Sequence, residues 1–245
     1  MNDALAMDAN TQREKTRPAE PSARLDDVAR LTTWLSPAFP VGGFSYSHGL
    51  EWVVEQGQVR DRASLTGWMQ DLLVHGAPRS DLVFLAEAWR AIAGGDEARL
   101  DALVELSAAF VPSAERRLET LAQGKAFLVA TQAVWPSAPL DHLQNVDLAY
   151  PVAVGCAAGA HGLDLGLTVR AFCQAFVANV VSAGVRLIPL GQTDGLRVLA
   201  ELEPLIGEVA SAALTATLDD IGGAAIAADI ASMRHETQYT RLFRS

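Results

Sequence analysis

Apolar residues recur three and four positions apart along most of this chain, and this spacing limits the fold more than any other feature. One helical face is visible at i, i+3, i+4, i+7 and i+8 in Leu65, Trp68, Met69, Leu72 and Leu73. The same spacing runs from Val169 to Val185 and through residues 81–93, 96–110, 114–134 and 195–217, where Pro204 is expected to kink or break the helix. Two-residue alternation and hairpin turn signals are absent from the sequence. We predict an all-α protein, a single-domain bundle of about eight to ten helices.

The first 24 residues differ from the rest. Residues 1–24 are polar, contain proline and show no periodicity, so we expect a disordered N-terminal tail before a helical domain at 25–245. A signal peptide has a basic region followed by an apolar region, and residues 1–24 have neither in that order. We therefore expect a cytoplasmic protein. Within the domain, Gly155, Ala158, Gly159 and Gly162 would let a second helix approach closely, inside the core or across a subunit interface.

Charge and cysteine content exclude several classes of protein. The formal net charge of −10 argues against a nucleic-acid binder, which needs a basic face. The longest apolar stretch, 168–188, is interrupted by polar and charged residues, so it fits a core helix better than a membrane span. Cys156 and Cys173 lie in apolar runs, which predicts buried free thiols and a reducing compartment.

The common catalytic motifs are missing or incomplete. Gly124-Lys125 lacks the first glycine and the Ser/Thr of a phosphate-binding loop, so nucleotide hydrolysis is not expected. Ser45 or Ser47 beside His48 would allow a small serine hydrolase, although no strand precedes them. The five histidines show no metal-binding spacing. A weak or shared metal site remains open, with His48 and His235 as candidates.

The stretch "SPAFPVGGFSYSHGLEW", residues 36–52, concentrates unusual side chains before a helix. Its prolines keep the backbone extended and its adjacent glycines permit angles closed to other residues. Ser47 is expected to cap the following helix, with Glu51 near its positive end. Phe39 and Trp52 are expected to pack inward, which leaves Phe44, Tyr46 and His48 as candidates for recognition by another protein.

The C-terminal "MRHETQYTRLFRS", residues 233–245, holds three arginines and one glutamate. Tyr239, Leu242 and Phe243 fall at i, i+3 and i+4, the spacing of a helix that enters a groove. They would serve equally well to fold back on the chain's own core. Arg and aromatic residues dominate interface hot spots, which suggests a segment ordered by a partner.

Three separated segments resemble the UreF family of urease accessory proteins. "WLSPAFPVGGFSYSHGLEW" (34–52) resembles the family's N-terminal signature, "RLIPLGQTDG" (186–195) its central motif, and residues 233–245 its C-terminal tail. The resemblance covers the chain from about Leu31 to Ser245.

The resemblance implies an all-α homodimer that has no catalytic activity and no tightly bound cofactor. Such a protein would bridge UreD (also called UreH) and the GTPase UreG, so that nickel is inserted into apo-urease. Transit of the nickel through an internal passage belongs to the same expectation. It also implies partner-binding residues in three groups: Phe44, Tyr46, Ser47, His48 and Glu51; Gly191 and Gln192; and Arg234, His235, Glu236, Tyr239, Arg241, Phe243 and Arg244. A direct nickel carrier and a small serine hydrolase are the alternatives.

Overall fold

The structure, a computed structural model, describes residues 21–244, with side chains from Arg24 onward. This part of the chain contains ten α-helices, three short 3-10 helices and no β-strand, which confirms the all-α prediction. The α-helices are α2 (Pro21–Trp34), α3 (Leu50–Glu55), α4 (Arg62–His75), α5 (Ala77–Gly94), α6 (Glu97–Ala109), α7 (Ala114–Val134), α8 (Tyr150–Ala160), α9 (Leu165–Leu187), α10 (Gln192–Ala213) and α11 (Ile226–His235). The 3-10 helices are η1 (Gly43–Ser45), η2 (Ala138–Leu143) and η3 (Leu218–Asp220).

The predicted tail, residues 1–24, lies outside the described residues except at its end. Helix α2 begins at Pro21, so residues 21–24 at the end of this predicted segment are helical. Proline suits this position because the first helical residue needs no backbone N–H donor.

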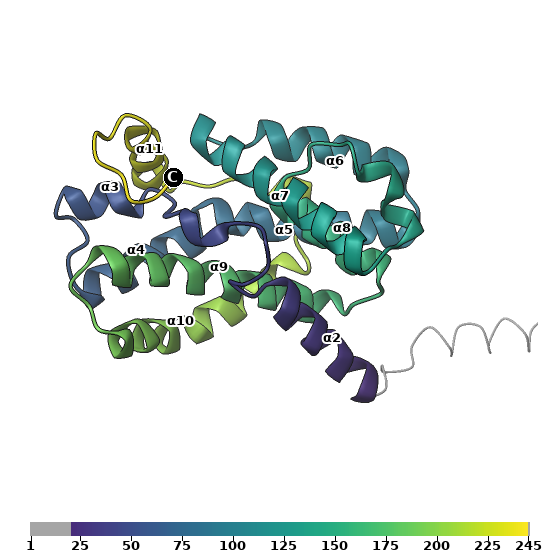
Figure 1. Cartoon of the computed structure of the whole chain (residues 1–245), viewed down its shortest axis with the longest axis horizontal. Coiled ribbons are helices and arrows are strands. Elements are labelled where there is room, and N and C mark those ends of the chain that lie inside the picture. The colour runs from purple at the N-terminus through teal and green to yellow at the C-terminus, as the bar shows by residue number, and fades with distance from the viewer. Residues whose placement is uncertain (1–20, 245) are drawn as a thin grey trace, which may run out of the picture.

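The centre of the molecule is the contact between α5 and α8 (Figure 1). A Cβ atom added at Gly155 would lie 2.3 Å from the carbonyl oxygen of Leu85, and one at Gly159 would lie 2.7 Å from that of Trp89. Only glycine permits so close an approach between two helix backbones. The small residues of α8 therefore serve the core of this chain.

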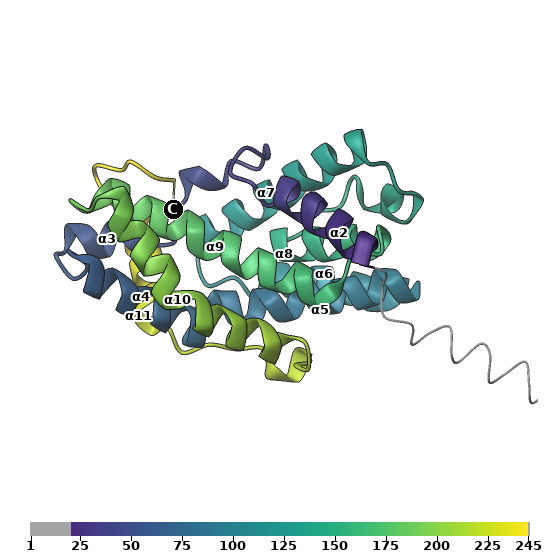
Figure 2. The ribbon, with the colours of Figure 1, turned by 90° about the horizontal axis from the view of Figure 1, so that it is seen from below.

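Helices α9 and α10 lie side by side along the length of the molecule (Figure 2). Helix α9 is long and apolar enough to cross a membrane by length and composition alone. In this fold α9 packs against α5, α3, α2 and α10, and side chains such as Val177 and Val180 are fully buried.

We predicted a kink or a break at Pro204; helix α10 continues through it, so there is no break. Pro204 cannot donate to the carbonyl of Ala200, one turn earlier. Both residues are exposed, so water can bind the unpaired carbonyl, and the helix tolerates the proline.

Candidate functional site

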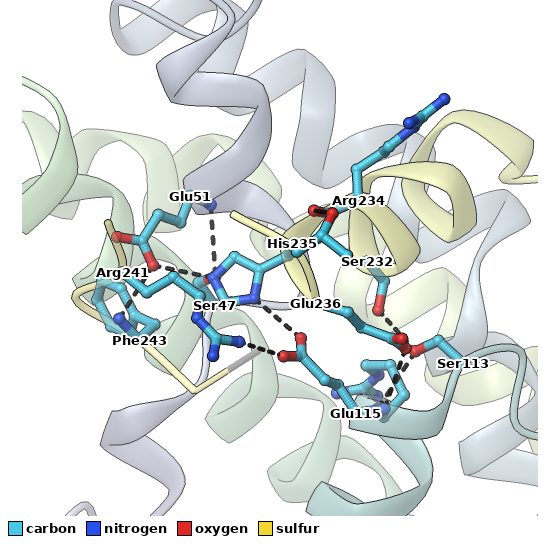
Figure 3. A network of polar contacts seen from close by, with 12 residues as sticks. Ser47, Glu51, Ser113, Glu115, Ser232, Arg234, His235, Glu236, Arg241 and Phe243 are labelled. Carbon is cyan, nitrogen blue, oxygen red and sulfur yellow. Dashed lines mark hydrogen bonds and ion pairs between the residues drawn. The ribbon is translucent and has the colours of Figure 1, made fainter. Parts of the chain in front are cut away.

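The loop before α3 and the C-terminal segment, about 190 positions apart in sequence, lie together in the structure (Figure 3). The backbone N–H of Arg244 donates to the carbonyl of Ser45 at 2.8 Å. Phe243 is buried, and the Arg186 guanidinium of α9 lies over its ring at 4.5 Å from the centroid. Arg186 also donates to the carbonyl of Phe44 at 3.1 Å. Helix α9 therefore supports both segments at once.

His235, the last residue of α11, is fully buried at the centre of this arrangement. Its Nε2 lies 3.0 Å from Glu51 Oε2 on α3, and its Nδ1 lies 2.9 Å from Glu115 Oε2 on α7. In the imidazolium form the ring donates to both carboxylates. Arg241 pairs with the other oxygen of Glu115, so a single cluster joins three helices.

Glu51 is the direct link between the two segments. Its carboxylate accepts the backbone N–H of Leu242 at 2.6 Å and that of Phe243 at 2.9 Å, in addition to the His235 contact. Its own backbone N–H donates to Ser47 Oγ at 3.3 Å. Because Glu51 is only 7% exposed, these hydrogen bonds are shielded from water and fix the path of the C-terminal segment.

The C-terminal segment also caps the start of α7. One oxygen of Glu236 accepts the backbone N–H groups of Ala114 at 3.1 Å and of Glu115 at 3.3 Å. Ser113 Oγ accepts the N–H of Arg116 at 3.2 Å and lies 2.8 Å from Ser232 Oγ on α11. A carboxylate at a helix N-terminus satisfies otherwise unpaired donors and suits the positive end of the helix dipole.

His48 belongs to a second buried cluster, with Arg116 and Glu119 of α7. Its backbone is left-handed, with φ 55°, which places the ring against Phe176 at 4.8 Å between centroids. Its Nδ1 accepts from Arg116, and its Nε2 lies 3.4 Å from Glu119 Oε1. Burial, reinforced by the Arg116 charge and opposed by Glu119, lowers the pKa of His48 to about 3. The imidazole is therefore neutral at physiological pH, with the proton on Nε2.

Glu119 completes this cluster. It is 3% exposed, pairs with Arg116 at 2.6 Å and accepts from Gln123 at 3.1 Å. A cavity of about 190 Å³ is lined by His48, Arg116 and Glu119 together with apolar residues such as Phe176. We call it the first cavity.

The predicted residues of the first loop are placed differently from one another. Phe44 is 58% exposed, whereas Tyr46 is buried and the His48 side chain is 12% exposed. Burial, with Glu119 adding to it, raises the pKa of Tyr46, and a hydrogen bond from Arg244 opposes that rise. Ser47 is not the N-cap of α3, because that position belongs to Gly49 in a left-handed conformation, although Ser47 still accepts from the first turn. Phe39 and Trp52 pack against the core as predicted.

The C-terminal segment is not a continuous helix. Helix α11 ends at His235, so Tyr239, Leu242 and Phe243 do not lie on a helix here, and of the two predicted alternatives Phe243 follows the second by folding back on the core. The physical reason is that Glu236 and the following backbone turn back to meet α7 and Glu51. Phe243 is buried, but Tyr239 is fully exposed and Leu242 is 67% exposed.

Arg234 is exposed and points away from the polar contacts (Figure 3). Gly191 and Gln192 are exposed at the start of α10, where the Gly191 carbonyl accepts from Asp194 at 3.0 Å in a turn. Neither Gly191 nor Gln192 takes part in the contacts that join the loop before α3 to the C-terminal segment.

The two candidate metal-binding histidines have both ring nitrogens engaged by protein groups. Over residues 21–244, His, Cys, Asp and Glu side chains form no group of three that would hold a metal ion. His48 directs its nitrogens to α7, so neither is directed to a neighbouring serine as a general base would require.

Sequence reasoning missed the contribution of α7, namely Glu115, Arg116 and Glu119. Charged residues at the start of a helix are usually solvated, and a single sequence does not show which are buried. A faint signal exists in the four-residue spacing of Glu119, Gln123, Phe127 and Thr131, which places the two polar residues on the same face as the buried phenylalanine.

The comparisons with known proteins agree with one another. A model of the UreF family matches residues 59–203. A urease accessory protein UreF of Rhodopseudomonas palustris (strain HaA2) is 58% identical over 219 residues, covering 88% of this chain and 92% of its own length. One of Bradyrhizobium sp. (strain BTAi1 / ATCC BAA-1182) is 53% identical over 239 residues, covering 96% of this chain and all of its own. The similarity thus extends beyond the family model to both segments of the candidate site.

Proposed function

The chain belongs to the UreF family of urease accessory proteins, and from this premise we propose that it is a non-catalytic scaffold in urease maturation. In this role it bridges the UreD (UreH) and UreG homologues of its host for GTP-dependent insertion of nickel into apo-urease. We further propose that it works as a homodimer in the cytoplasm, without nucleic acid, a membrane or a tightly bound cofactor, and that nickel passes through it only in transit.

One observation carries the scaffold proposal: buried charges fix the C-terminal segment, whereas its side chains Met233, Tyr239 and Leu242 remain exposed. Ile226, Ile230 and Met233 of α11 are spaced by four and three residues and are each about half exposed or more. With Tyr239 and Leu242 they form what we call the C-terminal surface. Several exposed apolar side chains on one helix and the segment that follows it are typical of a protein-binding surface.

We assign the C-terminal surface to the UreD homologue and the exposed Phe44 to the UreG homologue. Because Glu51 and His235 connect the two regions, a partner bound at one would influence the other. The alternatives gain no comparable support. A nickel carrier would need His48 or His235 to release a protein partner, and a hydrolase would need His48 to turn away from α7.

The test is light scattering on a size-exclusion column, with the full-length protein alone and then mixed with its host's UreD and UreG homologues. The double variant Ile230→Ser/Tyr239→Ser should lose the UreD homologue because both side chains are exposed on the C-terminal surface. Leu118→Ser is the matched control, since Leu118 is 73% exposed on α7 and lies outside that surface.

A double variant that still joins the UreD homologue with wild-type affinity would refute the assignment of the surface. A folded wild-type protein that joins neither partner would refute the scaffold role itself. Removal of residues 233–245 should also abolish assembly, but it deletes His235 and Glu236 as well and so reports on the whole network.

A further inference from the structure

The first cavity combines apolar walls with a small number of charged groups. Its apolar walls include Val41 of the loop before α3 and Phe172 and Phe176 of α9. Phe44 and Ser182 also border the cavity and are exposed, so this side of it lies at the surface. One water molecule needs roughly 10–15 Å³ of such space, so a cavity of about 190 Å³ has room for a small organic molecule.

Asp81 of α5 lines the first cavity without a partner. Its carboxyl group makes no hydrogen bond or ion pair with any of residues 21–244. Burial, opposed by the Arg116 charge and reinforced by Glu119, raises the pKa of Asp81 to about 6. The surface that Asp81 retains therefore faces enclosed space rather than bulk water, and at neutral pH the group is mostly ionised.

The charges around the first cavity do not balance. Among the described residues that line it, Arg116 carries the one positive charge, whereas Glu119 and Asp81 are both acidic. Glu119 is paired with Arg116 at 2.6 Å, and His48 is neutral because its pKa is about 3. The carboxylate of Asp81 is thus left uncompensated, and an unpaired buried charge is costly. A single positive charge beside Asp81 would balance it.

Tyr150 of α8 is a second polar group in the first cavity with unused hydrogen-bonding capacity. Its hydroxyl makes no hydrogen bond with residues 21–244, and burial raises the pKa of Tyr150, so the hydroxyl is neutral at physiological pH. The hydroxyl oxygen can accept a hydrogen bond from an ammonium group. The ring of Tyr150 lies 5.4 Å from that of Phe172 between centroids, and aromatic faces attract cations.

We propose that the first cavity is a binding site for a small primary amine, whose ammonium group pairs with Asp81 and donates to Tyr150 and whose apolar body packs against Phe172 and Phe176. A primary ammonium has three N–H donors, enough for both groups. The apolar body gains free energy by leaving water for these walls. A hydrated metal ion has no apolar body to bury, so the walls favour an organic amine.

Isothermal titration calorimetry of the full-length protein at neutral pH tests this site, with 2-phenylethylamine as the probe. 2-Phenylethanol is the control ligand, because it has the same apolar body without the charge. Asp81→Asn removes the carboxylate with little change of shape. Asp229→Asn is the matched control variant, since Asp229 is also a partly buried carboxyl near Arg116 but does not line the first cavity.

The wild type should bind one 2-phenylethylamine, and Asp81→Asn should raise the dissociation constant at least ~10-fold, because the charge-assisted pair is lost. Asp229→Asn should bind the amine as the wild type does, and 2-phenylethanol should bind equally weakly to all three proteins. No saturable binding of the amine by the wild type would overturn the proposal. Equal losses in Asp81→Asn and Asp229→Asn would also overturn it, because general negative charge would then hold the amine.

Asp81→Asn should fold at neutral pH, since it removes an unpaired buried charge. Tyr150→Phe provides a second and independent test, because it removes one acceptor of the ammonium group and should weaken amine binding. Wild-type affinity for the amine in a folded Asp81→Asn or Tyr150→Phe protein would overturn the site. The titration needs neither partner protein nor urease, so its outcome is independent of the complex assembly that tests the scaffold role.

Discussion

The substitution Glu51→Gln would test whether one carboxylate holds the C-terminal segment in place. Its two oxygens accept from Leu242 N at 2.6 Å, Phe243 N at 2.9 Å and His235 Nε2 at 3.0 Å. Glutamine has the same shape but offers one oxygen and one NH₂ group. At least one backbone N–H must then face another donor in a buried position.

The expected cost follows from the loss of a single charge-assisted hydrogen bond. Such bonds contribute ~1.5–3 kcal/mol, and a buried donor left unpaired costs a similar amount. Taking ~2 kcal/mol, and ~1.4 kcal/mol for each factor of ten, the equilibrium for detachment of the tail should shift by ~30-fold. The effect should be local, because the tail can open without unfolding the α5–α8 centre.

Native-state hydrogen exchange measures this shift directly. The amides of Leu242 and Phe243 should exchange ~30-fold faster in Glu51→Gln, whereas amides of α8 should be unaffected. Glu55→Gln is the control, because Glu55 is exposed at the end of the same helix. If the two tail amides keep their wild-type protection in a folded Glu51→Gln protein, the carboxylate does not hold the tail and the reasoning is wrong.

Three further predictions concern the core and its buried groups. Gly124→Ala should lower the free energy of unfolding, measured by thermal unfolding, by ~1–3 kcal/mol or more, because its Cβ would lie 2.0 Å from the Leu148 carbonyl oxygen. At the control position, Gly67, an added Cβ has open space, so Gly67→Ala should raise the free energy of unfolding by up to ~1 kcal/mol. Equal effects of the two substitutions would contradict the packing described. Burial raises the pKa of Asp81 to about 6. As the pH falls, the Asp81 carboxylate therefore takes up its proton in the folded state before it does so in the unfolded state, and the folded state gains stability between about pH 6 and pH 4. The Asp81→Asn variant lacks this gain, so its free energy of unfolding in denaturant titrations should fall more steeply on acidification than that of the wild type, by ~1 kcal/mol per pH unit. If the free energies of unfolding of the two proteins change in parallel with pH, the raised pKa of Asp81 is refuted. Burial raises the pKa of both cysteine thiols to about 12, so a disulfide reagent should modify them only as fast as the protein unfolds, and rapid labelling of the folded protein would contradict their placement.

The helices were predictable because their signal is local. The spacing of apolar residues foretold 114–134 to the residue and the approach of another helix to Gly155. A kink or a break was predicted at Pro204, and the break does not occur because both Pro204 and Ala200 are exposed to water, which the spacing of apolar residues does not reveal.

The candidate site was predictable only in part. The segments 36–52 and 233–245 both stood out by composition. Their contact through Glu51 and His235 joins positions about 184 residues apart, which no local pattern encodes. The left-handed backbone at His48 likewise could not be foreseen, since few residues other than glycine adopt it. Arg116 and Glu119 read as surface charges until the tertiary structure shows them buried.

The capping of α7 by Glu236 has a consequence for how the protein is made. The start of α7 and the carboxylate of Glu51 both bind residues that come much later in the sequence, namely Glu236 and Leu242. These residues are synthesised after the helices that they hold, so a growing chain can form its central helices before the candidate site. A chain that stopped before Glu236 would therefore lack the contacts that cap α7 and bind Glu51.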